Sequence, residues 1–354
     1  MESYSSLLVS GAAGFIGSNF ARYWFGRHPE SNVVVLDELT YAGSMANLQI
    51  VQDEPGFRFV QGNILDTPLV EKLLGEFGVD CIINFAAESH VDRSIIDPFL
   101  FYRTNAEGTL SLLSAALNVW GEEAEGKRFL QISTDEVYGS HSGEGAPFTE
   151  SSPCWPGNPY SASKAAADSL VVAYHNTYGM DTVITRSSNN YGANQFPEKL
   201  IPKSIERILN DESIPVYGNG LHRRDWIYVD DHARGVELAL HHGKSGHCYN
   251  LCAGQEISNI ELVRELCRCI SKVFESEPEL VDLFPKAKRA AMGQAQHLIA
   301  FVADRPGHDL AYTMSMARAQ EELGFEPQVS LADGLERTVR AYLHRAARLQ
   351  QVDT

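Results

Sequence analysis

The sequence predicts an α/β fold, with a doubly wound parallel sheet followed by a smaller mixed α/β lobe. Six short apolar runs alternate with segments of helical periodicity, as in a parallel sheet covered by helices. A glycine-rich loop joins the first apolar run to the first helical segment. Polar and titratable residues follow several of the runs, and in such sheets ligands bind outside the carboxyl ends of the strands.

The first strand is expected at Ser6–Ser10, and it leads directly into a loop with the spacing G-x-x-G-x-x-G. Gly11, Gly14 and Gly17 suit a tight turn, the close approach of a phosphate, and the packing of a helix on the strand. The helix that follows offers its N-terminal amides to a pyrophosphate. The loop therefore predicts a Rossmann-type dinucleotide site.

The second strand, Asn32–Leu36, ends in Asp37, twenty residues beyond Gly17. An acid at this distance is placed to accept a hydrogen bond from a ribose 2′-hydroxyl. Because no Arg or Lys lies between Arg27 and Arg58, a 2′-phosphate lacks a local cation. We therefore expect NAD rather than NADP.

Two further strands are expected at Phe57–Gln61 and Cys81–Phe85. The first leads into Gly62–Asp66, a candidate adenine contact, and the second into Ala86-Ala87, where small side chains let a cofactor pass close to the backbone. The charged residues that follow either shape the rim of the site or only solvate the loop. Phe99–Trp120 has helical apolar spacing, with Thr104-Asn105 near its start.

Titratable groups gather after the fifth strand, which we expect at Phe129–Ile132. Thr134, Asp135 and Glu136 follow it at the mouth of the sheet. Tyr160 and Lys164 lie four residues apart in a helical segment and so share one helical face. A lysine cation near the phenol would lower the pKa of Tyr160, which predicts a general base.

The sixth strand is expected at Asp181–Arg186, and from about residue 189 the pattern becomes irregular. We therefore predict a cofactor domain over residues 1–188, with returns from about 225–250, and a substrate-binding lobe over residues 189–354. Arg224 and Arg305 lie in loops of this second part and could each form paired hydrogen bonds with a pyrophosphate. The helices near 316–323 and 331–345 are expected to pack structurally.

The composition limits the classes of partner that this protein is expected to bind. The net charge of −17 disfavours nucleic acid and anionic membranes, which need clustered Lys and Arg. The six cysteines are scattered without a C-x-x-C pair, so we expect free thiols in the cytoplasm and no metal. The N-terminus has no cationic region, and no apolar run approaches the length of a membrane helix.

Taken together, the motifs resemble the extended short-chain dehydrogenase/reductase family, and within it the dTDP-glucose 4,6-dehydratases. They are GAAGFIGSN, LDELTYAGSMANL, AAESHVDRSI, STDEVYG, YSASK, SNNYGANQFPEKLIP, PVYGNG, RDWIYVDDHARG and DRPGHD. The resemblance implies NAD contacts at Phe15, Ile16, Asp37, Glu38, Leu39, Thr40, Asn63, Ile64, Phe85, Ala86, Ala87, Thr104, Tyr160, Lys164 and Asn190. It implies sugar-nucleotide contacts at Ser89, Thr134, Asn189, Glu198, Lys199, Leu200, Pro215, Tyr217, Arg224, Asn259, Arg305 and His308.

Three departures from the family pattern stand out. Ala12 replaces a second glycine, Ala193-Asn194 replaces Pro-Tyr, and Asn63 replaces an Asp at the adenine. The change at 193–194 lies close to the expected nucleotide and weakens the prediction of base specificity most. None of the three alters a reacting group.

The resemblance also implies a reaction on a hexose. Tyr160 takes the proton of the 4-hydroxyl, which Thr134 orients, while hydride passes from C4 to NAD. Glu136 then removes the C5 proton, Asp135 protonates the leaving C6 hydroxyl, and hydride returns to C6. The cofactor is regenerated and is expected to stay bound, and a homodimer is the expected assembly. Two alternatives stay open: a 4-epimerase or dehydratase of UDP- or GDP-sugars, and a non-catalytic NAD-sensing protein.

Overall fold

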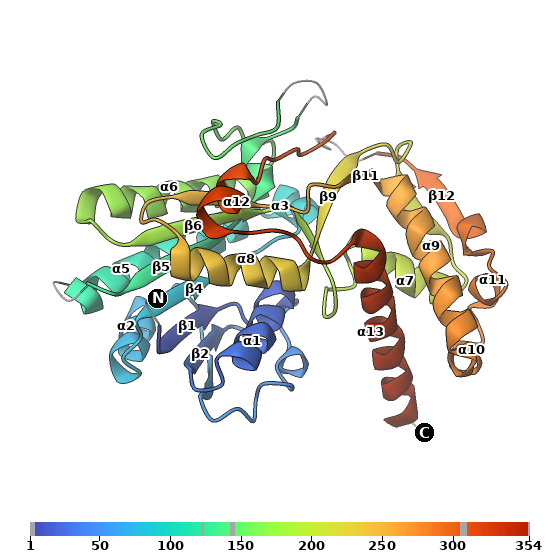
Figure 1. Ribbon diagram of the computed structural model, residues 1–354, viewed down its shortest axis with the longest axis horizontal. Helices are drawn as coiled ribbons and strands as arrows, with labels where there is room; N and C mark the ends of the chain where they lie inside the picture. The colour runs from blue at the N-terminus through green and yellow to red at the C-terminus, as the bar shows by residue number, and fades with distance from the viewer. Residues whose placement is uncertain (1–3, 122–123, 142–145, 305–309, 353–354) are drawn as a thin grey trace.

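The computed structural model describes residues 4–121, 124–141, 146–304 and 310–352. A seven-stranded parallel sheet of order β10-β6-β5-β4-β1-β2-β3 forms the centre of the larger lobe (Figure 1). Its strands are β1 (Ser6–Ser10), β2 (Asn32–Asp37), β3 (Phe57–Gln61), β4 (Cys81–Asn84), β5 (Arg128–Thr134), β6 (Thr182–Ser187) and β10 (Cys248–Leu251). The strand order reverses between β1 and β4, which is where this kind of sheet binds ligands. The predicted fold class is confirmed.

The six predicted strands all form, and a seventh joins them. β10 was not among the predicted strands, because its four residues, CYNL, give too short an apolar run. It pairs with β6, and its polar Asn250 is buried. Asn250 Oδ1 accepts from the Tyr138 hydroxyl at 2.8 Å, and its Nδ2 donates to the Ser315 carbonyl at 3.1 Å. Tertiary partners thus allow a polar residue in a buried strand.

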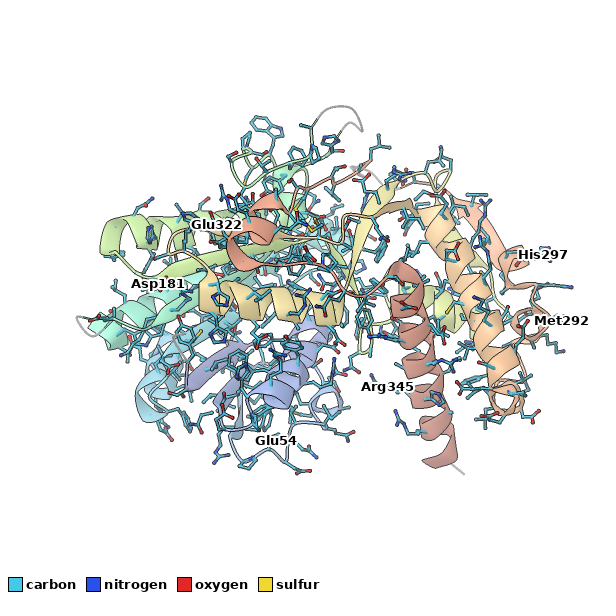
Figure 2. The ribbon with its side chains drawn as sticks, viewed as in Figure 1. Glu54, Asp181, Met292, His297, Glu322 and Arg345 are labelled. Atoms are coloured by element: carbon cyan, nitrogen blue, oxygen red, sulfur yellow. The ribbon has the colours of Figure 1, made fainter. Side chains whose placement is uncertain are left out.

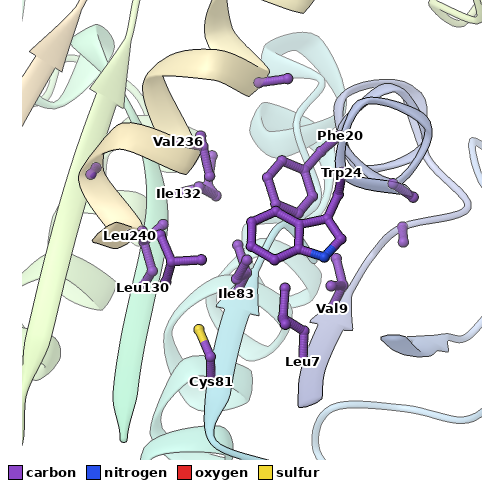
Figure 3. Close-up of a cluster of buried hydrophobic side chains, with 14 of the residues drawn as sticks. Leu7, Val9, Phe20, Trp24, Cys81, Ile83, Leu130, Ile132, Val236 and Leu240 are labelled. Atoms are coloured by element: carbon purple, nitrogen blue, oxygen red, sulfur yellow. The ribbon is translucent and has the colours of Figure 1, made fainter. Parts of the chain in front are cut away.

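Helices cover both faces of this sheet. α1 (Phe15–Arg27), α8 (Val229–His242) and α12 (Ala317–Leu323) lie on one face, and α2 (Thr67–Glu76), α5 (Gly108–Trp120) and α6 (Pro159–Tyr178) lie on the other. Figure 3 shows Phe20 and Trp24 of α1 packed over Leu7 and Val9. Leu8, between them, belongs to the core on the opposite face, as the two-residue period of a strand requires.

The predicted helix over Phe99–Trp120 is interrupted. α3 (Val91–Ile96) and α4 (Pro98–Phe101) precede a π-helical turn over Tyr102–Glu107, and α5 follows it. Asn105 in this turn accepts a hydrogen bond from the Glu88 amide at its Oδ1, at 2.9 Å. Its Nδ2 donates to the Glu88 carbonyl at 3.0 Å and to Ser163 Oγ at 2.8 Å. The turn therefore fixes the loop after β4 against α6.

The smaller lobe has its own core, formed mainly by helices. They are α7 (Leu200–Leu209), α9 (Asn259–Ser276), α10 (Pro278–Leu283), α11 (Lys288–Ala291) and α13 (Leu331–Val352). Two small sheets accompany them, β11-β9-β7 (Glu256–Ser258, Arg223–Tyr228, Asn189–Tyr191) and β12-β8 (Ile299–Val302, Ile214–Tyr217). Figure 2 shows the side chains of both lobes, with Arg345 marking α13 and Glu322 marking α12. The division of the chain at residue 189 stays a prediction.

Three single-turn 3-10 helices complete the described elements: η1 (Met45–Asn47), η4 (Asp135–Tyr138) and η5 (Ala295–Leu298). Ser258 caps α9 with a capping box that involves Glu261. In the parts of the chain that the structure describes, no helix combines the length and apolar character needed to cross a membrane.

A buried carboxylate ties β9 to the loops beside it, and we predict that Asp225→Ala destabilises the fold. Asp225 accepts from Ser188 Oγ at 2.6 Å and from the amides of Ala253 and Gln255 at 2.7 Å each. Its loss leaves the buried Ser188 hydroxyl and two partly buried amides without this acceptor, so urea denaturation should show a loss of about 2–5 kcal/mol. The exposed control Asp53→Ala should stay within about 0.5 kcal/mol. Equal values for the two variants would contradict the prediction.

Candidate active site

A cleft opens at the carboxyl ends of the strands, around the point where the strand order reverses. It encloses about 330 Å³ and is bounded by the glycine loop after β1, the loops after β2 and β4, the end of β5, the start of α6 and residues 187–199. Segments far apart in the sequence therefore meet at one site, as expected for an open parallel sheet.

The glycine loop packs so closely against neighbouring backbone that side chains would not fit, and this leaves space for a ligand to approach it. Gly11 has φ +71°, and a Cβ there would lie 2.5 Å from the amide nitrogen of Ala86. A Cβ at Gly17 would lie 2.6 Å from the Gly11 carbonyl oxygen. Gly14 begins α1 without a side-chain cap, so the first helical amides face the cleft without a competing acceptor from that residue. These features fit the pyrophosphate of a dinucleotide.

Asp37 lies at the end of β2 and is nearly buried. Its Oδ2 accepts from the amide of Ala13 and its Oδ1 from the amide of Leu39, both at 2.8 Å. Burial raises the pKa of Asp37, while these two hydrogen bonds act in the opposite direction. The carboxylate thus lines the cleft and also holds the glycine loop through the Ala13 amide. Its position in the sequence did not reveal this second role.

Lys164 is held at the end of β5. α6 begins with a capping box between Asn158 and Ser161, which places Tyr160 and Lys164 in its first two turns. The Lys164 ammonium is buried and donates to the carbonyl of Ile132 at 2.7 Å. Burial lowers the pKa of Lys164 to about 8, with Asp168, one turn further along, favouring the charged form.

The predicted direction of the Tyr160 pKa shift is wrong for this structure. Burial raises the pKa of Tyr160, and the Glu136 carboxylate raises it further. A hydrogen bond with Thr134 opposes the shift, and Lys164 is not among the groups that change it. The physical reason is that the lysine charge is directed at the Ile132 carbonyl, while the phenol lies in a buried site beside acids.

Thr134 ends β5, and Asp135 and Glu136 follow it, but the environments of the three residues differ. Thr134 Oγ1 donates to Asp135 Oδ1 at 3.1 Å, and the Glu136 amide donates to Thr134 Oγ1 at 3.3 Å. Asp135 is buried, and burial raises its pKa well above the usual range, with the Glu136 carboxylate adding to the shift. Burial therefore favours the neutral form of Asp135, whereas Glu136 is only partly buried.

The cleft brings together most of the residues singled out in the sequence. Among the predicted cofactor residues, the following line it: Gly11, Gly14, Phe15, Ile16, Gly17, Asp37, Glu38, Thr40, Asn63, Ile64, Phe85, Ala86, Ala87, Thr104, Tyr160, Lys164 and Asn190. Leu39 instead packs against the core beneath α1. The predicted substrate residues that line the cleft are Ser89, Thr134, Asn189, Glu198 and Lys199. Their binding roles stay predictions.

The remaining predicted substrate residues lie on the smaller lobe or outside the described chain. Leu200 begins α7, Pro215 and Tyr217 lie on β8, and Asn259 begins α9. Arg224 on β9 is buried, donates to the carbonyls of Arg223 and Leu310, and covers the ring of Tyr312. Arg305 and His308 fall within 305–309, outside the described residues.

Several cleft residues were missed from the sequence. Tyr41, Glu88, Gln195 and Phe196 line the cleft, and Glu88 is buried with Oε2 lacking a hydrogen-bond partner among the described residues. Burial raises the pKa of Glu88. Tyr41 and Glu88 lie within quoted motifs, so their position next to predicted contacts was the available signal.

A group of metal-ligand type lies elsewhere. His28, Glu237 and His241 have ligand atoms within 4.8 Å of one another, between α1 and α8. Glu237 already accepts from Tyr23 Oη at 2.7 Å and Arg27 Nε at 3.0 Å, and His28 Nε2 lies 2.7 Å from it. Hydrogen bonding within the protein therefore accounts for this cluster.

The fold and the cleft define an NAD-type Rossmann protein of the extended short-chain dehydrogenase/reductase class, with the Tyr-x-x-x-Lys pair at the end of β5. Residues 8–338 match the family model described as GDP-mannose 4,6 dehydratase, and the chain belongs to that family.

Curated relatives match over nearly the whole length. The low-salt glycan biosynthesis protein Agl12 of Haloferax volcanii is 47% identical over 338 residues, covering 95% of this chain and 98% of its own. The dTDP-glucose 4,6-dehydratases of Streptomyces griseus and Haemophilus influenzae are 45% and 40% identical, covering 95% and 97% of this chain and 93% and 99% of theirs.

Solved structures agree with the fold. The dTDP-glucose 4,6-dehydratase DesIV of Streptomyces venezuelae, with NAD and dTDP bound, has TM-score 0.83 and 44% identity, covering 96% of this chain and 97% of its own. The predicted resemblance to this group of enzymes is therefore confirmed. A UDP-glucose 4-epimerase of Thermotoga maritima shares the fold, with TM-score 0.79 and 24% identity over 96% of this chain and 99% of its own.

We predict that the stability difference between wild type and Lys164→Met changes with pH. The pKa of Lys164 is about 8 in the folded protein and about 10.4 in an unfolded chain. Between these values the unfolded chain binds a proton that the folded protein has released, so wild-type stability rises relative to the variant. From about pH 7.5 to about pH 9.5 the gain should be about 2 kcal/mol.

Urea denaturation of both proteins at the two pH values measures this difference. Lys72→Met, at an exposed position on α2, is the control and should show little change relative to wild type. A wild-type-to-Lys164→Met difference that is constant with pH would mean that burial does not perturb the ammonium.

Proposed function

We propose that this protein catalyses the NAD-dependent dehydration of dTDP-glucose to dTDP-4-keto-6-deoxyglucose, and that it is a hydro-lyase. The contrast between Asp135 and Glu136 carries the proposal. Elimination of water from a hexose needs one group that gives a proton at C6 and another that takes a proton at C5. The structure offers a buried Asp135, whose raised pKa favours the neutral acid, beside a more exposed Glu136 in the same cleft.

The residues of the cleft have separate tasks in this proposal. Thr134 orients the 4-hydroxyl, and Tyr160 accepts its proton. Glu136 removes the C5 proton, which the 4-ketone makes acidic, and Asp135 protonates the departing C6 hydroxyl. Lys164 keeps α6 fixed at the end of β5 through its bond to the Ile132 carbonyl.

NAD fits the larger part of the cleft. The glycine loop and α1 would hold the pyrophosphate, and Asp37 would receive a ribose hydroxyl. When bound, the nicotinamide takes up hydride from C4 and later returns it to C6. The raised pKa of Tyr160 means that the phenol keeps its proton until positive charge or substrate contacts favour the phenolate.

The relatives favour dehydration over epimerisation. The dehydratases named above are 40–45% identical to this chain, whereas the epimerases among the structural neighbours are 24–26% identical. A 4-epimerase needs no acid at C6, and a non-catalytic NAD sensor needs no proton relay at all. The buried Asp135, with its raised pKa, supports the dehydratase, and a product lighter by one water than its substrate would select the dehydratase over the epimerase and the sensor.

We predict that Glu136→Gln and Asp135→Asn stop the reaction at different steps. Glu136→Gln keeps the size of the side chain but cannot accept the C5 proton, so it should oxidise C4 and accumulate bound NADH without C5 exchange. Asp135→Asn should retain some C5 exchange, while water loss falls roughly 10²- to 10⁴-fold. Single-turnover absorbance of NADH and mass spectrometry of the sugar quenched in heavy water measure both effects.

Two results would overturn these assignments. C5 exchange at the wild-type rate in Glu136→Gln would remove Glu136 as the base. Failure of both variants to form NADH would mean that the two acids only support the geometry of the site.

We also propose a cytoplasmic homodimer. Large apolar side chains are exposed along α3, α4, the π-helical turn and α6, elements that contact one another: Ile95, Ile96, Phe99, Tyr102, Val172 and Tyr178. Large exposed apolar side chains on neighbouring elements are typical of a protein interface, and twofold symmetry would pair this face with its own copy. Free cysteines among the described residues suit a reducing compartment.

We predict that Phe99→Glu weakens the dimer. Phe99 is 76% exposed within this apolar face, so a buried, unpaired charge would result if the face is the interface. Light scattering after gel filtration should show monomer where the wild type shows dimer. Ile50→Glu, at a position 68% exposed and outside this face, is the control and should leave the dimer intact. A dimer that persists in Phe99→Glu would place the interface elsewhere.

A further inference from the structure

A short segment of the smaller lobe forms part of the wall of the cleft. We call residues 195–199 the strap: it follows Asn194, whose φ is +69°, and leads into α7. Gln195, Phe196, Glu198 and Lys199 of the strap all line the cleft that contains the glycine loop. The strap therefore lies beside whatever ligand the cleft holds.

Tyr41, in the loop after β2, contacts the strap in two ways. Its hydroxyl donates to Glu198 Oε1 at 3.1 Å, and its ring meets the Phe196 ring edge to face, with centroids 5.2 Å apart. The guanidinium of Arg93 lies over the Tyr41 ring, 3.7 Å from its centroid. Burial and the Glu198 carboxylate raise the pKa of Tyr41, so the phenol stays a donor at neutral pH.

The loop after β4 makes a second set of contacts with the strap. Lys199 Nζ donates to the Ser89 carbonyl at 3.0 Å, and His90 Nε2 lies 3.6 Å from Glu198 Oε2. His90 Nδ1 accepts from the amide of Arg93, so in the neutral ring Nε2 carries the proton and faces the Glu198 carboxylate. Two loops of the larger lobe thus hold one carboxylate of the smaller lobe.

A second cavity adjoins the strap. A cavity of about 830 Å³ lies on its other side, lined by Asn194, Phe196, Leu209, Phe284 and Tyr342 among others. Tyr342 Oη donates to the Gln195 carbonyl, which anchors the start of the strap to α13. Gln195 and Phe196 line both the cleft and this cavity, so the strap forms a wall between them. Moving the strap into the cavity would break its contacts to Tyr41, Ser89 and His90.

We propose that Tyr41 and His90 are positioning residues that hold the strap across the cleft and so retain the dinucleotide between turnovers. This inference rests on the proposed function, because a reaction that regenerates its own cofactor gains from slow release. Loss of the reduced cofactor in mid-cycle would leave a keto sugar that the enzyme cannot reduce. Opening the strap requires breaking a charge-assisted hydrogen bond, which slows dissociation.

Release of NADH tests the proposal. Bound NADH is followed by its fluorescence after mixing with excess NAD, in wild type, Tyr41→Phe and Tyr23→Phe. Tyr23 is a matched control, since its hydroxyl donates to the Glu237 carboxylate at 2.7 Å between α1 and α8. Tyr41→Phe should release NADH roughly tenfold faster or more, the range expected for a lost hydrogen bond to a charged group. Tyr23→Phe should release it at the wild-type rate.

A second readout separates positioning from general damage. Purified Tyr41→Phe should contain less NAD than wild type, and added NAD should restore its turnover. His90→Ala should release NADH faster than wild type, and the double variant with Tyr41→Phe faster than either single one. Release from Tyr41→Phe within about twofold of wild type, or equal acceleration in Tyr23→Phe, would overturn the proposal.

The release experiment does not depend on the reaction. If wild type binds NADH but dehydrates no nucleotide sugar, the proposed function fails, while the release rates still decide whether Tyr41 holds the strap. If dehydration is observed and release from Tyr41→Phe is unchanged, the proposed function stands and this inference fails.

Discussion

The hydrogen bond from the buried Lys164 ammonium to the Ile132 carbonyl is the contact on which the geometry of the cleft depends. A buried cation is costly unless an acceptor receives it, so α6 can meet β5 only where this carbonyl is available. Tyr160 lies one helical turn before Lys164 and is thereby brought to Thr134, at the end of the same strand. A single helix-to-strand contact thus sets the distance between the predicted base and the acids after β5.

The environment then separates two acids that adjoin in the sequence. Asp135 lies in the buried interior, where the neutral form is favoured, while Glu136 is more exposed and acts on its neighbours as a charge. Neighbouring carboxyl groups with different surroundings can serve as acid and base at one pH. The same Glu136 charge raises the pKa of Tyr160, so the three groups form one coupled electrostatic unit, and a change in one alters the others.

Local chemistry decided what could be predicted from the sequence. The glycine spacing, Asp37 and the triplet Thr134 to Glu136 are set by short-range requirements, and the structure brings them to one cleft. β10 and the π-helical turn at Asn105 escaped prediction because their polar groups are satisfied by distant partners, Tyr138 and Ser163. The bond from Tyr41 to Glu198 joins residues 157 positions apart, and no local pattern marks it. The Tyr160 pKa was misjudged because spacing gives proximity to Lys164 but not burial.

A chain of net charge −17 must attract a doubly anionic nucleotide without a basic surface. At physiological ionic strength the field of distant acids is screened beyond about 8 Å, so groups inside the cleft decide binding. Three of the predicted site cations lie in the described part of the chain, and each donates to a backbone carbonyl: Lys164, Lys199 and Arg224. Positive charge held in place in this way needs little reorganisation when an anion arrives, and this preorganisation offsets the acidic surface.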